Sequence, residues 1–326
     1  MRIVLLDQGA MEFSRHGDLD FSRLASTLPE WQAYEATADA QVAERIANAT
    51  VAVSNKVRID DAAMRNAPHL RLICIAATGA NHVDLDAARR RGIAVCNVPG
   101  YATASVVQHV FALILALSIR LPDYQQALRA GRWQQGSQFC LLDYPIREIS
   151  GKTLGIIGYG ELGQAVARVA EAFGMKVMVA QYRYGHREGQ PNAGQTRIPL
   201  QELLPQVDIL SLHCPLTPET RGLIGAAELA LMRPDALLIN TARGGIVDEA
   251  ALAAALCQGK LGGAGVDVLT QEPPTQGNPL LTANIPNLIL TPHIAWASRE
   301  ARQRLVNEVA ANIRAFLQGE ARHRVA

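Results

Sequence analysis

The sequence predicts an α/β protein with two doubly wound parallel-sheet domains. Short apolar runs alternate with helical segments along almost the whole chain, which is the pattern of parallel α/β folding. The length of 326 residues corresponds to about two domains, since domains commonly contain roughly 100–200 residues. A glycine-rich turn between a strand and a helix marks a second α/β series that begins near Lys152.

The composition limits the kinds of partner that the protein is expected to bind. Hydrophobic residues make up 49% of the chain and charged residues 19%, as in a globular protein that folds unaided. Thirty-one basic and 30 acidic residues leave a formal charge of +1, without the basic excess that nucleic-acid binding needs. The longest apolar run, residues 110–117, is far shorter than the ~20 residues of a membrane span. We therefore expect neither nucleic acid nor a membrane as a partner.

The cysteines and the start of the chain indicate a cytoplasmic protein. The apolar run at residues 1–6 is too short for a signal peptide. No cysteine pair has the spacing of a metal site or a redox loop, so we expect buried thiols in a reducing compartment. The five cysteines are Cys74, Cys96, Cys140, Cys214 and Cys257.

The elements follow in order. In the first hundred residues we expect strands at 3–7, 51–54, 72–75 and 94–97, with amphipathic helices at 38–47 and 84–91. Residues 102–120 are too continuously apolar for an exposed helix and predict a buried one, followed by a second helix at 124–131. Later strands are expected at 153–157, 176–180, 209–212, 236–240, 263–268 and 288–291. Ser298 is a plausible N-cap for a last helix, whose apolar face is Leu305, Val309, Ile313 and Leu317.

The strongest motif is G-x-G-x-x-G at residues 158–163, between a strand and a helix. Gly158 permits the tight turn, Gly160 lets the backbone approach a pyrophosphate, and Gly163 lets the helix pack on the strand. Glu161 and Leu162 open that helix, whose N-terminus offers N–H groups to phosphate. The motif therefore predicts dinucleotide binding.

The residue after the second strand of this series indicates whether the cofactor is NAD or NADP. A carboxylate normally stands there to hold the ribose 2′-hydroxyl of NAD, but this chain has Gln181, with Arg183, His186 and Arg187 close behind. Arginine suits bidentate contacts to a 2′-phosphate. We therefore expect NAD or NADP as the cofactor, with NADP(H) accepted; the alternative is that these arginines are solvated loop charges.

Three polar side chains follow successive late strands. Arg243, Glu272 and His293 stand where the strand ends of an open α/β sheet place ligand groups. Taken singly, they could be a surface charge, a loop carboxylate and a helix-cap or core histidine. Together they predict an acid–base site.

Several blocks of sequence resemble the D-isomer-specific 2-hydroxyacid dehydrogenases. They are residues 158–163, His213–Thr217 with the sequence HCPLT, Asn240–Asp248 with NTARGGIVD, Glu272–Pro273, and Thr291–Ala295 with TPHIA. The similarity covers essentially the whole chain. Residues 76–84 and 138–144 further resemble the glycerate dehydrogenase, or hydroxypyruvate reductase, branch.

The resemblance implies roles for the three polar residues. His293 would give a proton to the carbonyl oxygen of a 2-oxo acid as hydride arrives from the nicotinamide, and would act as base in the reverse direction. Glu272 would bond the other ring nitrogen and orient His293. Arg243 would clamp the substrate carboxylate with a planar, permanently charged fork.

The resemblance also implies further contacts. Ala77, Thr78 and Gly79 match a loop whose backbone grips the substrate carboxylate; the alternative is a plain turn. Asp267 matches a residue that bonds the nicotinamide carboxamide. The remaining cofactor contacts implied are Pro215, Thr220, Thr241, Ala242, His293 itself and Ala295. Ordinary turn or strand-end roles are the alternative for Asp267, Pro215 and Thr220.

The architecture implied is a Rossmann cofactor domain, residues 101–294, inserted in a flavodoxin-like substrate domain, residues 1–100 and 295–326. The family implies reduction of a small 2-oxo acid, hydroxypyruvate or glyoxylate, to the D-2-hydroxy acid. Residues 102–130 resemble its dimerisation arm, which implies a homodimer; a buried helix within the domain is the alternative. Two rival functions stay open, a non-catalytic dinucleotide sensor and a dehydrogenase of the formate or phosphite type.

Overall fold

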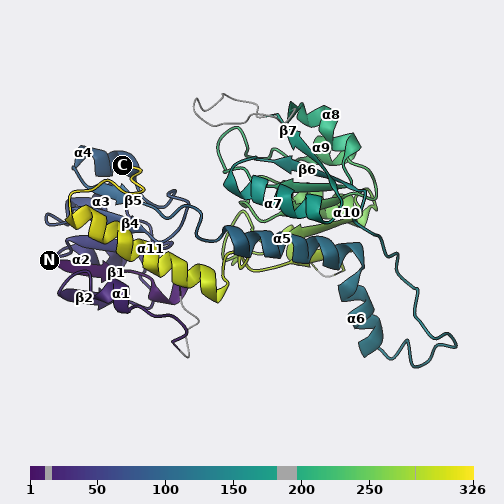
Figure 1. Ribbon diagram of the computed structural model, residues 1–326, viewed down its shortest axis with the longest axis horizontal. Coiled ribbons are helices and arrows are strands. Elements are labelled where there is room, and N and C mark those ends of the chain that lie inside the picture. The colour runs from purple at the N-terminus through teal and green to yellow at the C-terminus, as the bar shows by residue number, and fades with distance from the viewer. Residues whose placement is uncertain (12–16, 182–196, 283) are drawn as a thin grey trace. The chain divides into compact units, whose positions relative to one another are not determined.

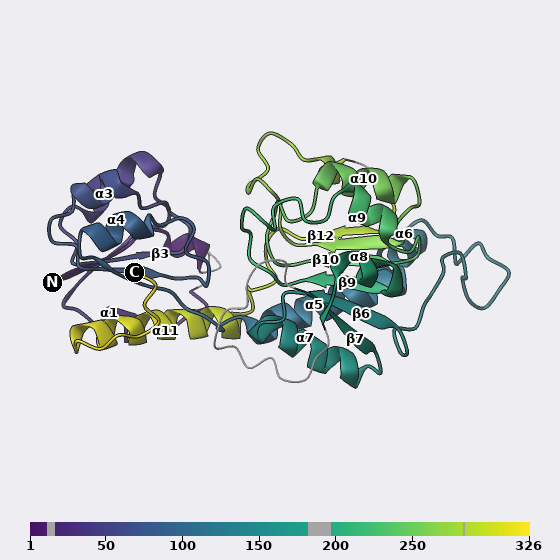
Figure 2. The same ribbon diagram turned by 90° about the horizontal axis from the view of Figure 1, so that it is seen from above.

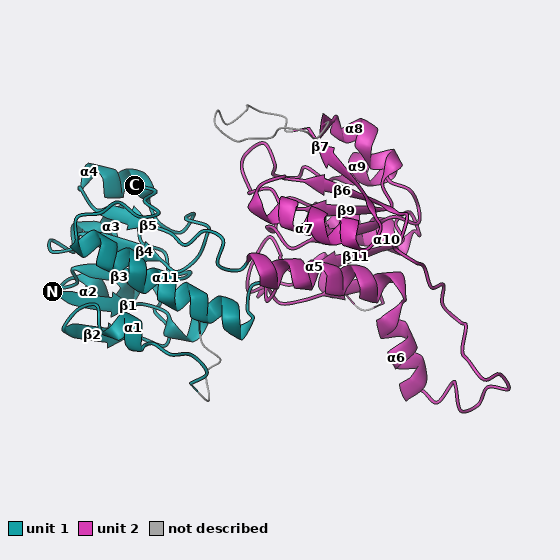
Figure 3. Cartoon of the chain, in the orientation of Figure 1, with its two compact units in different colours: residues 1–102, 296–326 teal, residues 103–295 magenta. Residues whose placement is uncertain are grey.

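The chain forms two compact units. The computed structural model describes residues 1–11, 17–181, 197–282 and 284–326. Unit 1 comprises Met1–Ala102 and Trp296–Ala326, and unit 2 comprises Thr103–Ala295 (Figure 3). The chain therefore builds most of unit 1, then all of unit 2, and returns to unit 1 at its end. From the sequence we placed the two crossings at 100/101 and 294/295.

Unit 1 is built on a five-stranded parallel sheet in the order β2-β1-β3-β4-β5 (Figure 1). This is the flavodoxin-like strand order, in which β2 lies on one side of β1 and the later strands β3, β4 and β5 lie on the other. The strands are β1 (Arg2–Leu5), β2 (Glu30–Ala33), β3 (Val51–Ser54), β4 (Leu72–Ile75) and β5 (Ala94–Cys96). The helices are η1 (Gln8–Ala10), α1 (Ser22–Ala25), η2 (Asp39–Gln41), α2 (Val42–Ile46), α3 (Asp61–Arg65), α4 (Leu85–Arg90) and α11 (Arg299–Leu317).

The helices of unit 1 cover both faces of its sheet (Figure 2). On one face α11 and α1 bury an apolar core, to which Leu305, Val309 and Ile313 of α11 contribute side chains that are 0% exposed. Ser298 caps this helix as predicted, accepting a bond from the backbone of Ala301. Leu317 is 39% exposed, so its assignment to the packed face was wrong. Helices α2, α3 and α4 close the other face.

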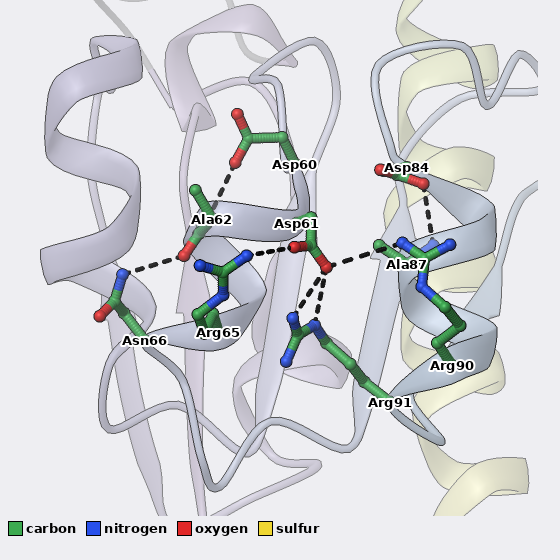
Figure 4. Close-up of polar contacts among 10 residues, drawn as sticks. Asp60, Asp61, Ala62, Arg65, Asn66, Asp84, Ala87, Arg90 and Arg91 are labelled. Carbon is green, nitrogen blue, oxygen red and sulfur yellow. Dashed lines mark hydrogen bonds and ion pairs between the residues drawn. The ribbon is translucent and has the colours of Figure 1, made fainter.

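Aspartate N-caps and ion pairs stabilise the short helices α3 and α4 of unit 1 (Figure 4). Asp60 and Asp84 each accept a bond from the backbone three residues on, at 2.9 and 2.8 Å, which satisfies a helix N–H that has no partner in the helix. Asp61 accepts bonds from both Arg65 and Arg91, and this holds the pKa of its carboxyl below the usual range. The network ties the start of α3 to the end of α4.

Unit 2 is built on a seven-stranded parallel sheet in the order β12-β11-β10-β9-β6-β7-β8. Read from β8, this is the Rossmann order with one strand added at the far edge. The strands are β6 (Thr153–Ile157), β7 (Lys176–Ala180), β8 (Arg197–Ile198), β9 (Ile209–Leu212), β10 (Leu237–Asn240), β11 (Gly263–Val266) and β12 (Leu288–Leu290). The predicted fold class is confirmed in both units.

Helices cover both faces of this sheet too, α5 and α7 on one and α9 and α10 on the other (Figure 2). The helices of unit 2 are α5 (Thr103–Ser118), α6 (Leu121–Arg129), α7 (Glu161–Ala172), α8 (Leu200–Leu203), η3 (Leu204–Gln206), α9 (Ala226–Leu231), α10 (Glu249–Cys257) and η4 (Pro279–Leu281). The predicted buried helix is α5. Gly265 in β11 makes room for it, because a Cβ there would lie 3.0 Å from the Cβ of Leu113.

A segment that begins with α6 extends away from the body of unit 2 (Figure 1). We call α6 and the following residues to 147 the arm; the dimerisation arm predicted from the sequence, residues 102–130, overlaps it only at 121–130 and otherwise consists mainly of α5. Among the residues that the structure describes, no single helix is long and apolar enough to cross a membrane. The bent pair α5 and α6 passes that test of length and composition only when both are taken together, and much of α5 is buried against the sheet.

The structure corrects three expectations. Strands β2 and β8 were not predicted, and the second helix begins at Leu121 rather than at 124. The five cysteines form no disulfide, but they are not all buried: Cys140 is half-buried and Cys257 is exposed. Cys257 is the last residue of α10.

Candidate functional site

The candidate site lies at one edge of the unit 2 sheet. Register pairs run across five neighbouring strands at the same level, through Ile157, Leu212, Asn240, Val266 and Leu290. Because all the strands are parallel, the chain leaves every one of them at this edge. The predicted residues that follow these strand ends are Gly158, Pro215, Thr241, Ala242, Arg243, Asp267, Glu272 and His293, with Gln181 after β7.

His293 and Glu272 form the hydrogen-bonded pair that the sequence predicted. The Nδ1 atom of His293 lies 2.6 Å from Oε2 of Glu272, whose other oxygen accepts a bond from the backbone of Leu269 at 2.8 Å. The two side chains are 25% and 34% exposed, so a ligand can reach the pair. The backbone of His293 is left-handed, with φ 56°, and its N–H bonds the carbonyl of Asp267.

Arg243 is held by a turn that packs against the loop carrying Glu272. The side chain of Asn240 accepts from the backbone of Ala242 and donates to the carbonyl of Arg243, which fixes the turn. A Cβ on Gly244 would lie 1.9 Å from the carbonyl oxygen of Leu269, so only glycine permits this approach. The turn after β10 and the loop before Glu272 are therefore in direct contact, as the prediction of one shared site requires.

Two glycines of the turn, Gly158 and Gly163, have the geometry that they were predicted to supply. Gly158 has φ 93°, and a Cβ there would lie 2.5 Å from the backbone of Cys214. A Cβ on Gly163 would lie 2.1 Å from the carbonyl oxygen of Gly158, so α7 packs directly on the turn. Gly160 is different, because a Cβ there meets nothing within 4 Å. Within the described part of the chain no atom explains that glycine, whereas a phosphate brought against the backbone would.

The residues present fit a bound dinucleotide in two further ways. A cavity of about 300 Å³ opens beside the ends of β6, β7 and β9, and Gln181 and Thr220 are among its lining residues. The hydroxyl of Thr241 is buried and has no hydrogen-bond partner among the residues that the structure describes, which is costly unless a ligand supplies one. Gln181 itself is exposed and donates its backbone N–H to Ile198. Arg183, His186 and Arg187, on which the NADP(H) prediction also depends, lie outside the described residues.

Asp267 supports the turn that carries His293. Its carboxylate is 1% exposed and accepts bonds from the backbone of Ile294 and Ala295, both at 2.9 Å, and from the hydroxyl of Thr291. The contact between Asp267 and the cofactor, which the resemblance implied, stays a prediction. The same is true of Ala295, which is buried.

Sequence reasoning missed the part that His109 plays here. Its Nε2 lies 3.0 Å from the hydroxyl oxygen of Thr291 and 3.6 Å from the carboxylate of Asp267. One turn earlier on α5, Ser105 donates to the carbonyl of Ala295 at 2.7 Å. The signal was available, because Ser105 and His109 are polar residues four apart in a mainly apolar helix and therefore share a face.

Other predicted residues form hydrogen bonds within their own unit. In unit 2, Glu161 accepts a bond from Thr103 at 2.7 Å, and Thr220 donates to the carbonyl of Pro215 at 2.7 Å. In unit 1, Ala77, Thr78 and Gly79 follow β4, and the Thr78 hydroxyl donates to the carbonyl of Val98. Within the described ranges, no group of three His, Cys, Asp or Glu side chains could hold a metal ion.

Known proteins share these features. Residues 111–295 match the family described as D-isomer specific 2-hydroxyacid dehydrogenase, NAD binding domain. A glycerate dehydrogenase of Methylorubrum extorquens is 46% identical over 292 residues, which cover 89% of this chain and 90% of the relative. The chain belongs to this family. A hydroxypyruvate reductase of Blautia hydrogenotrophica is 38% identical over 98% of both chains.

A similar solved structure has the same fold. It is an NADPH-dependent glyoxylate/hydroxypyruvate reductase from Sinorhizobium meliloti, in complex with NADP and malonate. Its TM-score is 0.80 at 32% identity, covering 100% of this chain and 96% of that one. As a D-2-hydroxyacid dehydrogenase, this chain carries the family's NAD-binding domain in unit 2.

Proposed function

We propose that this dehydrogenase reduces hydroxypyruvate or glyoxylate to the D-2-hydroxy acid, and catalyses the reverse reaction. The observation that carries the proposal is the His293–Glu272 pair, 2.6 Å apart, whose loop packs on the turn of Arg243 at the ligand edge of the sheet. The names of the relatives, glycerate dehydrogenase and hydroxypyruvate reductase, support these substrates.

The chemistry of the side chains supports the direction of proton flow. The nicotinamide cofactor, when bound, supplies or accepts the hydride. Because Glu272 engages Nδ1 of His293, the exchange of a proton with the substrate oxygen falls to Nε2. Arg243 is permanently charged and suited to bind the substrate carboxylate. Ala77, Thr78 and Gly79 are the further substrate-binding residues that we propose, in unit 1.

We also propose that NADP(H) is accepted. The support is the amide of Gln181 where a carboxylate would repel a 2′-phosphate, together with the NADPH dependence named for the Sinorhizobium meliloti reductase. The ratio of kcat/KM for NADPH and NADH tests this point. A large preference for NADH would contradict it.

A homodimer formed through the arm completes the proposal. Trp133, Phe139, Leu142 and Ile146 are 49%, 89%, 77% and 58% exposed, and all lie on the arm. So large an apolar surface is typical of a protein interface. A second copy of this chain is the occupant we propose, and a cytoplasmic location stays a prediction.

The decisive experiment follows the absorbance of the reduced cofactor after addition of hydroxypyruvate, glyoxylate, pyruvate or a bulkier 2-oxo acid. We expect rapid oxidation with the first two. Oxidised cofactor with formate or phosphite is the control for the rival dehydrogenases. Turnover with neither group of substrates would favour the dinucleotide sensor and contradict the proposal.

A further inference from the structure

The loop of unit 2 that carries Glu272 lies almost entirely at the surface. Along residues 270–277, every residue except the half-buried Pro274 is exposed. Inside the loop, the side chain of Gln271 donates to the hydroxyl of Thr275 at 3.2 Å, a bond that shapes the loop but does not fix it to another element. A loop with so little buried surface keeps one position only where polar contacts tie it to a more stable element.

Glu249, the first residue of α10, supplies such contacts. Its Oε1 atom accepts bonds from the backbone N–H of Thr270 at 2.6 Å and from the hydroxyl of the same residue at 2.9 Å. Its Oε2 atom accepts a bond from the side chain of Asn278 at 2.6 Å. Bonds to an ionised acceptor are about twice as strong as bonds between neutral groups. One half-buried carboxylate therefore holds the loop shortly before Glu272 and again at its end.

Helix α10 is a stable base for this carboxylate. Leu252 and Leu256 of the helix are buried in the apolar core of unit 2. Asp248 caps the helix by accepting a bond from the backbone of Ala251 at 3.0 Å. The position of Glu249 is therefore set by core packing and by the cap, and does not depend on the loop that it holds.

The held stretch of the loop is the one that directs Glu272 to its partner. One oxygen of Glu272 accepts a bond from the backbone of Leu269 at 2.8 Å, and the other lies 2.6 Å from Nδ1 of His293. Thr270, which Glu249 holds, lies between Leu269 and Glu272 in the chain. A shift of the backbone at Thr270 would therefore move the carboxylate of Glu272 away from the imidazole.

We propose that Glu249 is a positioning residue, which holds this loop so that Glu272 stays paired with His293. The inference rests on the proposed function, because it concerns the acid–base pair of the same site. The turn of Arg243 has its own support in the side chain of Asn240. Loss of Glu249 should therefore impair proton transfer more than binding of the substrate carboxylate.

The test compares Glu249→Ala and Glu249→Gln with the unchanged protein, using hydroxypyruvate and the reduced cofactor. In Glu249→Ala we expect kcat to fall by about 10- to 100-fold, because a misplacement of about 1 Å can cost roughly 10²-fold, while KM and the Kd for the reduced cofactor change little. Glu249→Gln keeps an oxygen for Thr270 and should recover most of kcat. Glu228→Ala is the matched control: this half-buried carboxylate accepts a bond from the backbone of Gly225 at 3.1 Å in the first turn of α9, so its loss should leave kcat unchanged.

Asn278→Asp tests the same contact from the other side. The aspartate keeps an oxygen for the backbone of Leu280, which Asn278 bonds at 2.9 Å, but it places a second carboxylate opposite Glu249. We expect kcat to fall while KM changes little, as in Glu249→Ala. This variant carries the test if Glu249→Ala does not fold.

A double variant distinguishes positioning from a general structural role. In a protein that carries Glu272→Ala there is no carboxylate to orient, so the addition of Glu249→Ala should lower kcat little further. A fall by the same factor in both backgrounds overturns the inference, and so does an equal fall in Glu228→Ala. An active protein that keeps its kcat in both Glu249→Ala and Asn278→Asp overturns the inference alone. An unchanged protein that is inactive with every 2-oxo acid overturns the proposed function and the inference with it.

Discussion

At the scale of single residues, His293 occupies a backbone conformation that a side chain disfavours. A non-glycine residue with φ 56° costs on the order of 1–2 kcal/mol, which the surroundings must offset. The bond from its N–H to the carbonyl of Asp267, and the bond between Nδ1 and Glu272, hold it from two sides. The imidazole is therefore oriented before a substrate arrives, which is the condition for efficient proton transfer.

Replacement of the imidazole tests its role directly. His293→Gln is expected to lower kcat by about 10²–10⁴-fold, because general acid–base catalysis is worth that much, with little change in cofactor affinity. Steady-state kinetics with hydroxypyruvate, together with a cofactor titration, provides the measurement. Turnover close to that of the unchanged protein would remove His293 as the proton donor.

Arg243→Ala is expected to change the kinetics in a different way from His293→Gln. Loss of a carboxylate clamp that also polarises the carbonyl should raise KM and lower kcat together, whereas His293→Gln should act mainly on kcat. The carbonyl, not the side chain, of Arg243 accepts the bond from Asn240, so the turn should survive the substitution. A change in KM alone would leave Arg243 with a binding role only.

At the scale of elements, the turn into α7 offers a matched pair of glycines. A Cβ at Gly160 would meet no atom of the described residues within 4 Å, but one at Gly163 would lie 2.1 Å from the carbonyl oxygen of Gly158. Gly160→Ala should therefore keep the thermal midpoint and weaken NAD(P)H binding. Gly163→Ala should lower the midpoint, because α7 must shift away from the turn.

Cofactor titrations and thermal unfolding of both variants provide the readout. A Gly160→Ala protein that binds NAD(P)H as well as the unchanged chain would contradict the assignment of Gly160 to the phosphate. A Gly163→Ala protein with an unaltered midpoint would show that α7 does not depend on this close approach.

The sequence predicted those elements whose requirements are local. The glycine spacing at 158–163 and the continuous apolar run of α5 can each be recognised within a short stretch of sequence, because the physical requirement that each one meets is local. Strand β2 was not predicted because its sequence lacks an apolar run. Glu30–Ala33 lies at the sheet edge and is exposed or half-buried along its length. The bond from His109 to Thr291 joins residues 182 apart and could be inferred only from the shared polar face of α5.

At the scale of the whole molecule, the exposed apolar side chains of the arm predict a dimer. Its exposed Phe139 and Leu142 should be covered by a second copy of the chain. We expect light scattering during size-exclusion chromatography to give twice the mass of 35.1 kDa for the unchanged protein. Phe139→Ser with Leu142→Ser should halve the measured mass, because the interface loses its most exposed apolar side chains.

A matched substitution away from the arm controls for surface effects. Leu281→Ser removes a side chain that is 52% exposed in η4 and should leave the mass unchanged. An unchanged protein that elutes with the mass of one chain would contradict the dimer.

Two half-buried histidines couple the stability of both units to pH. Burial lowers the pKa of His82 in unit 1 and of His213 in unit 2 from 6.5 to about 4. Between these values the unfolded chain binds protons that the folded chain does not, so stability falls as pH falls from about 6.5 to about 4. Each histidine contributes at most about 3 kcal/mol, and below the folded pKa the loss stops.

Urea midpoints measured at about pH 7 and about pH 5 should therefore differ, with the lower midpoint at the acidic pH. His82→Phe and His213→Phe replace a titrating ring with a non-titrating one of similar shape, so each should reduce that difference, and the double variant should reduce it further. His69→Phe, at an exposed position, is the control. A pH dependence unaltered in the double variant would assign the acid sensitivity to other groups, because neither histidine ring would then resist protonation in the folded state.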